Sequence, residues 1–252
     1  MYRFAFGAIL VALHIYKGQE GENERKINAG IDTEPDQLIA AAAMLLDHIG
    51  AELLPGVLWL RIVGRLAFPV FSLCIWEGSR RTRHPRRYLA RVLGMGLLCM
   101  AAFWVYTGRL YGNILITFTL SLCVLYAFQF WKRRHGLSGA LVLLGTLVGV
   151  AALCLWIPVD YGFWGVLLPL FAEIAAHLPV KNLPEGVLSR LGFALGLIVV
   201  ALRLGGVQIY SLLAVPLLFA YRGERGQHNL GRFFYWFYPL HLLVIGLVSM
   251  VL

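Results

Sequence analysis

The chain has 252 residues, of which 60% are hydrophobic and 14% are charged; its net charge is +9 and its mean hydropathy is +0.74. A soluble domain of this length has too little interior to bury so much apolar surface, so the composition predicts an integral membrane protein. The basic residues lie in short loops between apolar runs. This follows the positive-inside rule and argues against nucleic acid as a partner.

The apolar runs are long and continuous, without the alternation of outer-membrane strands, so the sequence predicts an all-α fold, a polytopic bundle of about nine transmembrane helices. Allowing about 20 residues for a crossing, the predicted spans in chain order are 38–57, 58–77, 88–107, 110–131, 137–157, 161–178, 187–203, 207–221 and 234–252. Residues 1–37 form an atypical amino-terminal extension, a short apolar segment followed by a polar linker. Residues 38–252 form the transmembrane domain.

The distribution of arginine and lysine predicts the orientation of the spans. The loops at 79–91 and 131–135 are the most basic, and placing them in the cytoplasm assigns the loops at 179–186 and 222–233 to the same side. Those four segments hold most of the arginine and lysine of the predicted loops, so the assignment is self-consistent. It also places the linker before the first span in the cytoplasm and the carboxyl terminus outside.

Two neighbouring spans carry ionisable residues at mid-depth. The first span contains Asp47 and His48, and the second contains Arg61 and Arg65 on one helical face. Charged side chains inside a bilayer are costly, so they usually face the bundle interior and serve a purpose. Pro69 cannot donate a hydrogen bond to the Arg65 carbonyl, which predicts a kink. We expect Asp47, His48 and Arg65 to form a buried polar cluster in which Asp47 neutralises Arg65.

The polar cluster can be either a structural ion pair between two helices or a site of chemistry. Within it, His48 can pair with Glu52 one helical turn later or with a group on another helix. The last span carries His241 just beyond a second helix-kinking proline, Pro239. A lone buried histidine is usually a packing residue, but two histidines and an arginine at mid-depth favour chemistry.

Two further polar positions lie near the predicted outer ends of the spans. Asn113 precedes the apolar part of the fourth span, and Asp160 and Tyr161 begin the sixth. Helix capping can explain such residues without any functional role. The four cysteines all lie inside apolar runs and lack metal-ligand spacing, so we predict no metal site.

Five stretches carry a resemblance to a known family. They resemble the TraX family in order and spacing and cover about residues 38–252: "LIAAAAMLLDHIG" (38–50), "RIVGRLAFPVFSLCIWEG" (61–78), "YGNILITF" (111–118), "DYGFWGVLL" (160–168) and "FYWFYPLHLLVIGL" (234–247). The family is distantly similar to the membrane acyltransferases that O-acetylate surface sugars.

The resemblance implies an acetyltransferase of the bacterial inner membrane. It would move an acetyl group from acetyl-CoA, the donor substrate, to a pilin-like protein amino terminus or an envelope glycan, without a metal. The positions that match the family's motifs are Asp47, His48, Arg65, Phe68, Pro69, Asn113, Tyr161 and His241.

Acetyl transfer from a thioester needs a base, for which neutral histidine is suited. We expect His48 to be that base, with Asp47 or Glu52 orienting the site and His241 assisting proton transfer or positioning the acceptor. Arg65 would stabilise the oxyanion or bind donor phosphate. The further expected contacts to substrate come from Arg61, Asn113 and Tyr161 and, for the CoA phosphates, from Arg80 and Arg81 in the loop at 79–91.

Two non-enzymatic functions remain as alternatives. Intramembrane Asp, His and Arg also mark proton relays, so a small proton-coupled transporter is one. A pilus or envelope assembly factor with a purely structural ion cluster is the other. The sequence leaves open the acceptor, the oligomeric state and whether the acetyl group crosses the bilayer.

Overall fold

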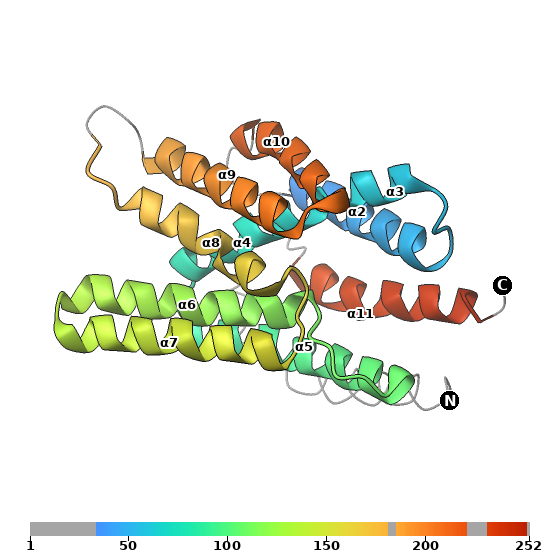
Figure 1. Cartoon of the computed structure of the whole chain (residues 1–252), viewed down its shortest axis with the longest axis horizontal. Helices are drawn as coiled ribbons and strands as arrows, with labels where there is room; N and C mark the ends of the chain where they lie inside the picture. Colours follow the sequence, from blue (N-terminus) through green and yellow to red (C-terminus); the bar gives the residue numbers. More distant parts are fainter. Residues whose placement is uncertain (1–33, 181–184, 221–230, 251–252) are drawn as a thin grey trace. The chain divides into compact units, whose positions relative to one another are not determined.

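The computed structural model describes residues 34–180, 185–220 and 231–250, and these form two compact units (Figure 1). The middle unit comprises the described part of 75–200. The end unit comprises the described parts of 6–74 and 201–252. Every regular element in the described ranges is a helix, which confirms the predicted all-α fold.

Each of the nine predicted spans coincides with helical structure. In chain order the helices are α2 (Glu34–Glu52), α3 (Leu58–Gly64), α4 (Ala67–Arg81), α5 (Pro85–Thr107), α6 (Ile114–Arg134), α7 (Leu137–Trp156), α8 (Gly162–Ala176), α9 (Glu185–Leu204), the 3-10 helix η2 (Gly206–Ala214), α10 (Val215–Ala220) and α11 (Gly231–Val248). Five segments are long and apolar enough to cross a membrane: Leu58–Arg81, Pro85–Thr107, Ile114–Arg134, Leu137–Trp156 and Gly186–Leu204. That the remaining predicted spans also cross the membrane stays a prediction.

The first two spans end or break where proline requires it. Helix α2 ends at Glu52, before the predicted boundary at residue 57, because Pro55 and Gly56 follow and both disfavour helix. The second span is divided at Arg65 and Leu66 into α3 and α4. The break lies one turn before Pro69, where the missing proline N–H leaves the Arg65 carbonyl without its helical donor. The predicted kink is therefore confirmed.

The eighth span is a 3-10 helix that continues into a short α-helix. It begins at Gly206, directly after Gly205, and the φ angles of these two glycines, 53° and 62°, lie in the left-handed region that glycine tolerates. At its other end Val215 donates its backbone N–H to the Leu212 carbonyl, a tighter turn than an α-helix makes. Pro216 has no backbone N–H with which to bond that carbonyl instead.

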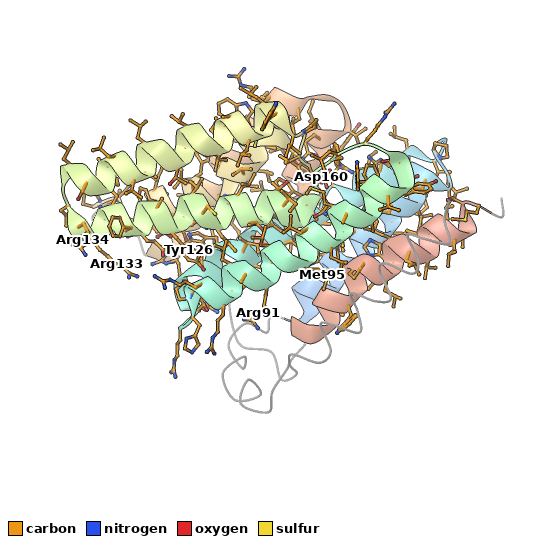
Figure 2. The ribbon with its side chains drawn as sticks, turned by 90° about the horizontal axis from the view of Figure 1, so that it is seen from below. Arg91, Met95, Tyr126, Arg133, Arg134 and Asp160 are labelled. Carbon is orange, nitrogen blue, oxygen red and sulfur yellow. The ribbon has the colours of Figure 1, made fainter. Side chains whose placement is uncertain are left out.

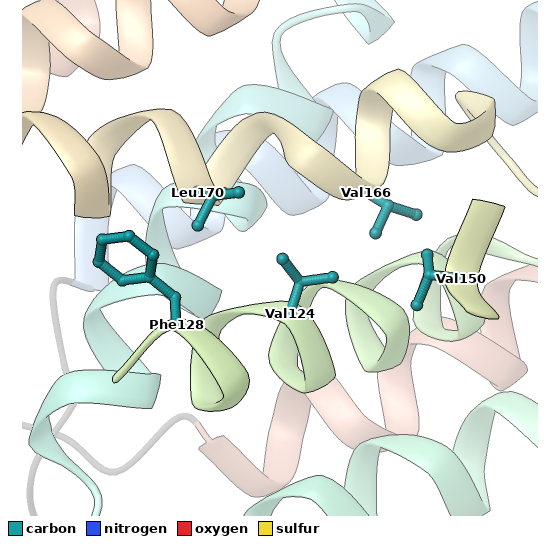
Figure 3. Close-up of a cluster of buried hydrophobic side chains, with 5 residues drawn as sticks. All are labelled: Val124, Phe128, Val150, Val166 and Leu170. Carbon is teal, nitrogen blue, oxygen red and sulfur yellow. The ribbon is translucent and has the colours of Figure 1, made fainter. Parts of the chain in front are cut away.

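The middle unit is built around α6, which packs against α5, α7 and α8. A cluster of buried apolar side chains fills the space between α6, α7 and α8 (Figure 3): Val124, Phe128, Val150, Val166 and Leu170. By contrast, Leu155 and Trp156 at the end of α7 are 89% and 87% exposed, as expected of side chains that face lipid.

The two ends of α6 differ in charge and in capping. Arg133 and Arg134 lie at its carboxyl end and Asp160 lies beside its other end (Figure 2). At that other end the Asn113 side chain accepts hydrogen bonds from the N–H groups of the first helical turn. The loop before α6 also pairs with the loop between α7 and α8, because the Gly112 N–H donates to the Pro158 carbonyl at 2.8 Å. Within this unit, basic residues thus lie at one end of α6, in the loop predicted to be cytoplasmic, and an acidic residue lies beside the opposite end.

In the end unit, α2 packs closely against α3, while α11 contacts α2 and η2 contacts α3. A Cβ atom added to Gly50 would come within 2.7 Å of the Leu60 Cβ, and one added to Gly64 would overlap Asp47. Two glycines therefore allow the two helices to approach closely. Helices α2, α3, η2 and α11 bring the ionisable residues of three distant chain segments together.

Candidate functional site

Asp47 on α2 faces both arginines of the second span. Its carboxylate pairs with Arg65 through Oδ2, and its Oδ1 lies 3.0 Å from the Nη1 of Arg61. The same Arg61 nitrogen donates to the Asp47 backbone carbonyl at 2.9 Å. The side chains of Asp47 and Arg65 are 14% and 12% exposed. The predicted neutralisation of Arg65 by Asp47 is confirmed, and Arg61, one turn away on the same face, shares the carboxylate.

His48 points to a different helix from its neighbour Asp47, as the 100° rotation between adjacent helical residues requires. Its ring lies 5.1 Å, centroid to centroid, from the ring of His241 on α11. Glu52, the partner considered from the sequence, is exposed. Because His48 directly follows Asp47 in sequence, the imidazole pair lies beside the ion cluster.

His241 is held in one orientation by its own helix. It is 5% exposed, its ring stacks on Phe237 with centroids 4.9 Å apart, and Tyr238 contacts it edge to face. Its Nδ1 lies 2.7 Å from the Phe237 carbonyl oxygen. A carbonyl can only accept, so Nδ1 carries the hydrogen and Nε2 of the neutral ring keeps its lone pair. That buried Nε2 has no hydrogen-bond partner within the described ranges.

The fourth element of the cluster is η2. Gln208, which is 6% exposed, accepts a hydrogen bond from Arg65 Nη1 through Oε1 at 3.4 Å. Ser211 lies three residues later and is fully buried. We call Asp47, His48, Arg61, Arg65, Gln208, Ser211 and His241 the end-unit cluster.

The end-unit cluster combines a base with donors. The lone pair of His241 Nε2 can accept a proton, and the Arg65 guanidinium, fixed by Asp47 and Gln208, supplies positive charge in a largely buried setting. A base next to oriented donors is what acyl transfer requires. Of the predicted catalytic residues, the structure brings together Asp47, His48, Arg65 and His241, with Arg61 beside them.

Asn113 and Tyr161 belong to the middle unit and have structural contacts there. Besides capping α6, Asn113 donates through Nδ2 to the Gly96 carbonyl at 2.8 Å. Tyr161 precedes α8 with a φ of 62°. The neighbouring Asp160 accepts a hydrogen bond from the Tyr111 hydroxyl at 2.9 Å. The capping interpretation of Asn113 is confirmed, and substrate contact by Asn113 and Tyr161 stays a prediction.

Arg80 and Arg81, the predicted phosphate ligands, each have a carboxylate partner in the middle unit. Arg81 lies 3.5 Å from Glu77, and Arg80 Nε lies 3.8 Å from Glu173. Glu173, which no sequence motif singled out, is 1% exposed. Other arginines of the same loop are exposed to solvent: Arg83, Arg86 and Arg87. Binding of CoA phosphates by this loop stays a prediction.

Glu173 is the centre of a second buried polar group. Trp76 Nε1 donates to Oε2 at 2.8 Å, and Gln129 Nε2 donates to Oε1 at 3.4 Å. The Arg80 guanidinium also lies over the Trp76 ring, 5.1 Å from its centroid. We call Trp76, Arg80, Gln129 and Glu173 the middle-unit cluster.

Sequence reasoning missed Gln208 and Ser211. They are two polar residues in the largely apolar stretch "GVQIYSLLAVPLLFA" (206–220), which begins at the second residue of the pair Gly205 and Gly206. Their spacing of three makes them neighbours on an α-helix and places them directly above one another on a 3-10 helix. The glycine pair and Pro216 were the available signals for that geometry.

Comparisons with known proteins agree with the resemblance. A family model described as TraX protein matches residues 36–249. The chain is 29% identical over 248 residues to a probable fimbrial assembly protein FimC, serogroup H1, of Dichelobacter nodosus, covering 86% of this chain and 95% of that protein. It is 30% identical over 230 residues to Protein TraX of Escherichia coli strain K12, covering 84% and 85%, respectively.

A second Protein TraX from Escherichia coli is 28% identical over 228 residues, covering 84% of this chain and 85% of that protein. No solved structure matches the chain. Because the family model spans nearly all of the transmembrane domain, including every residue of the end-unit cluster, the chain belongs to the TraX family.

Proposed function

We propose that this protein is an integral membrane acetyltransferase of the bacterial inner membrane. It would transfer an acetyl group from acetyl-CoA to a pilin-like protein amino terminus or an envelope glycan. One observation carries the proposal: the His48 and His241 rings lie 5.1 Å apart beside the buried pair of Asp47 and Arg65. An imidazole with an available lone pair and a fixed guanidinium are the two groups that acyl transfer to an amine or hydroxyl needs.

The reaction assigns a task to each group. The acceptor nitrogen or oxygen attacks the thioester carbonyl, forming a new bond to carbon, while its proton passes to His241 Nε2. The carbon–sulfur bond then breaks, and the CoA thiolate takes the proton from the imidazolium to leave as a thiol. The Phe237 carbonyl holds His241 in the accepting tautomer. We assign His241 as the base in preference to His48, which would pass protons to or from it.

Arg65 supplies positive charge where the carbonyl oxygen becomes negative. Its position is set by Asp47 on one side and Gln208 on the other. Asp47 thereby acts as a positioning residue, and the Gly64 contact that brings α3 against it is part of the same arrangement. Removing a donor or charge of this kind typically lowers the rate about 10²–10³-fold.

The names of the relatives guide the choice of acceptor. One relative is called a probable fimbrial assembly protein, and two others are called TraX. We therefore favour a pilin-like amino terminus over a glycan. The same name supports a second candidate function, a pilus assembly factor without enzymatic activity, in which the end-unit cluster only ties helices together.

One assay separates the two functions. Purified protein in vesicles is given acetyl-CoA with a labelled acetyl group and either a processed pilin peptide or envelope glycan. The enzyme predicts labelled acceptor with wild type and loss of label with His241→Gln and with Arg65→Gln. Absence of label with every acceptor, or equal labelling by both variants, would exclude the enzyme; pilus assembly by a His241→Gln strain would then support the assembly factor.

A further inference from the structure

Helix η2 carries two buried polar side chains whose hydrogen-bonding capacity is incomplete among the residues that the structure describes. Gln208 is 6% exposed and Ser211 is fully buried. A 3-10 helix has three residues in each turn, so side chains at i and i+3 lie above one another. Gln208 and Ser211 therefore share one face of η2, the face that meets Arg65.

The contact with Arg65 fixes which way the Gln208 amide is turned. A guanidinium can only donate hydrogen bonds, so the atom 3.4 Å from Arg65 Nη1 has to be the amide oxygen. The NH2 group is consequently the other arm of the side chain. It is buried, and neither this Nε2 nor the Ser211 Oγ has a hydrogen-bond partner in the described part of the chain.

Two buried donors that have no partner in residues 34–180, 185–220 and 231–250 require an explanation, because native proteins satisfy nearly all buried polar groups. An amide N–H and a hydroxyl both donate, and an oxygen atom with two lone pairs satisfies both at once. The carbonyl oxygen of a thioester is such an atom. It becomes more negative as the tetrahedral intermediate forms, so donors placed here bind the transition state more strongly than the substrate.

We infer that Gln208 Nε2 and Ser211 Oγ donate hydrogen bonds to the acetyl carbonyl oxygen during transfer. The two groups are catalytic donors that act together with the positive charge of Arg65, which also holds the Gln208 amide in position through its oxygen. The inference rests on the proposed acetyltransferase function and assigns the oxyanion contacts within it. No covalent bond to either side chain forms or breaks.

Two substitutions of Gln208 separate donation from positioning. Gln208→Glu keeps an oxygen that accepts from Arg65 but removes the N–H donors, whereas Gln208→Leu removes both. We expect kcat to fall about 10²-fold or more in both variants, with the KM for acetyl-CoA changed by less than about threefold because the ground-state contact is the weaker one. A loss confined to Gln208→Leu would show that only the Arg65 contact matters and would overturn the inference.

Ser211→Ala provides a test that misfolding cannot imitate. Removing a buried hydroxyl without a partner should leave the melting temperature of the purified protein equal to or above that of wild type, while kcat falls about 10²-fold. Ser189→Ala is the matched control, because Ser189 is also buried but its Oγ donates to the Gly186 carbonyl in the middle unit. We expect Ser189→Ala to keep the wild-type kcat.

The outcomes distinguish this inference from the function on which it rests. Wild-type protein that labels no acceptor would overturn both. Active wild type, with Gln208→Glu and Ser211→Ala at the wild-type kcat, would overturn the donor assignment alone and leave the acetyltransferase intact.

Discussion

Asp47 and Glu173 are both buried carboxylates on apolar helices, yet their surroundings differ. Both oxygens of Glu173 have partners in Trp76, Gln129 and Arg80. Around Asp47, in contrast, buried polar atoms without a hydrogen-bond partner among the described residues gather on two elements: those of Gln208 and Ser211 on η2, and that of His241 on α11. Asp47 itself is paired, and its partner Arg65 also donates to the Gln208 amide oxygen.

The comparison distinguishes buried polar groups that stabilise the packing from buried polar groups that take part in function. A buried polar group that is fully hydrogen-bonded stabilises a unique packing, whereas one without a partner costs free energy that only another role repays. We therefore interpret the middle-unit cluster as structural and the end-unit cluster as the site of chemistry. Substitutions that compare the two clusters test this interpretation directly.

The largest difference in kcat is expected between substitutions of two histidines, one in each unit. His241→Gln removes the proposed base and should lower kcat about 10²–10⁴-fold while leaving the protein folded. His177→Gln is the matched control, because His177 also places Nδ1 2.8 Å from the carbonyl four residues earlier but lies in the middle unit. Acetyl transfer by purified protein measures both. Similar losses in the two variants would contradict the functional distinction between the clusters.

Removing each carboxylate charge should separate the clusters by stability. Asp47→Asn leaves Arg61 and Arg65 without their shared counter-ion, and breaking a buried ion pair costs about 3–5 kcal/mol. Glu173→Gln keeps an oxygen for Trp76, and its NH2 group can donate to the Gln129 amide oxygen once that amide turns over. The lost pair with Arg80, whose side chain is 30% exposed, should then cost about 1 kcal/mol or less. Unfolding in detergent measures both free energies. A larger loss for Glu173→Gln would show that the ion pair of the middle-unit cluster contributes more to stability than that of Asp47.

Disturbing the close contact of α3 with Asp47 should lower the free energy of unfolding by less than removing the Asp47 charge does. A Cβ added by Gly64→Ala overlaps Asp47, so α3 has to move and the free energy of unfolding should fall by about 1–3 kcal/mol. Acetyl transfer should fall with it, because Arg65 follows Gly64 directly. Gly94→Ala is the control: its Cβ meets no atom within 4 Å, so higher helix propensity should stabilise α5 by up to about 1 kcal/mol. Unchanged activity in Gly64→Ala would show that the Arg65 position is tolerant.

Helical periodicity and hydrophobicity were sufficient to predict the all-α fold, the order of the helices and the pairing of Asp47 with Arg65. These features depend on local rules, namely the length of an apolar run, the positions of prolines and the depth of a charge along a helix. The break before Pro69 followed from the missing proline N–H.

The contacts between distant segments could not be predicted in the same way. The approach of His241 to His48 depends on how α11 packs against α2, and the contact of Gln208 with Arg65 depends on η2 being a 3-10 helix. Both are properties of tertiary packing. Glu173 was overlooked for the related reason that its partners on α4 and α6, Trp76 and Gln129, lie 97 and 44 residues away in sequence.

The smallest effect is expected for a polar pair at a loop of the middle unit, formed by Tyr111 and Asp160. Tyr111 lies between α5 and α6, and burial together with the neighbouring Asp160 carboxylate raises the pKa of its hydroxyl above the ordinary value. A raised pKa in the folded state favours the neutral phenol, so this contribution to stability is complete below about pH 10 and is lost as the pH rises through the folded-state value. Tyr111→Phe should cost less than about 1 kcal/mol at neutral pH, because the Tyr111 side chain is only partly buried, and should leave acetyl transfer unchanged. The difference in unfolding free energy between wild type and variant should shrink in strongly alkaline solution, and a constant difference would show that the hydroxyl titrates as it does in the unfolded chain.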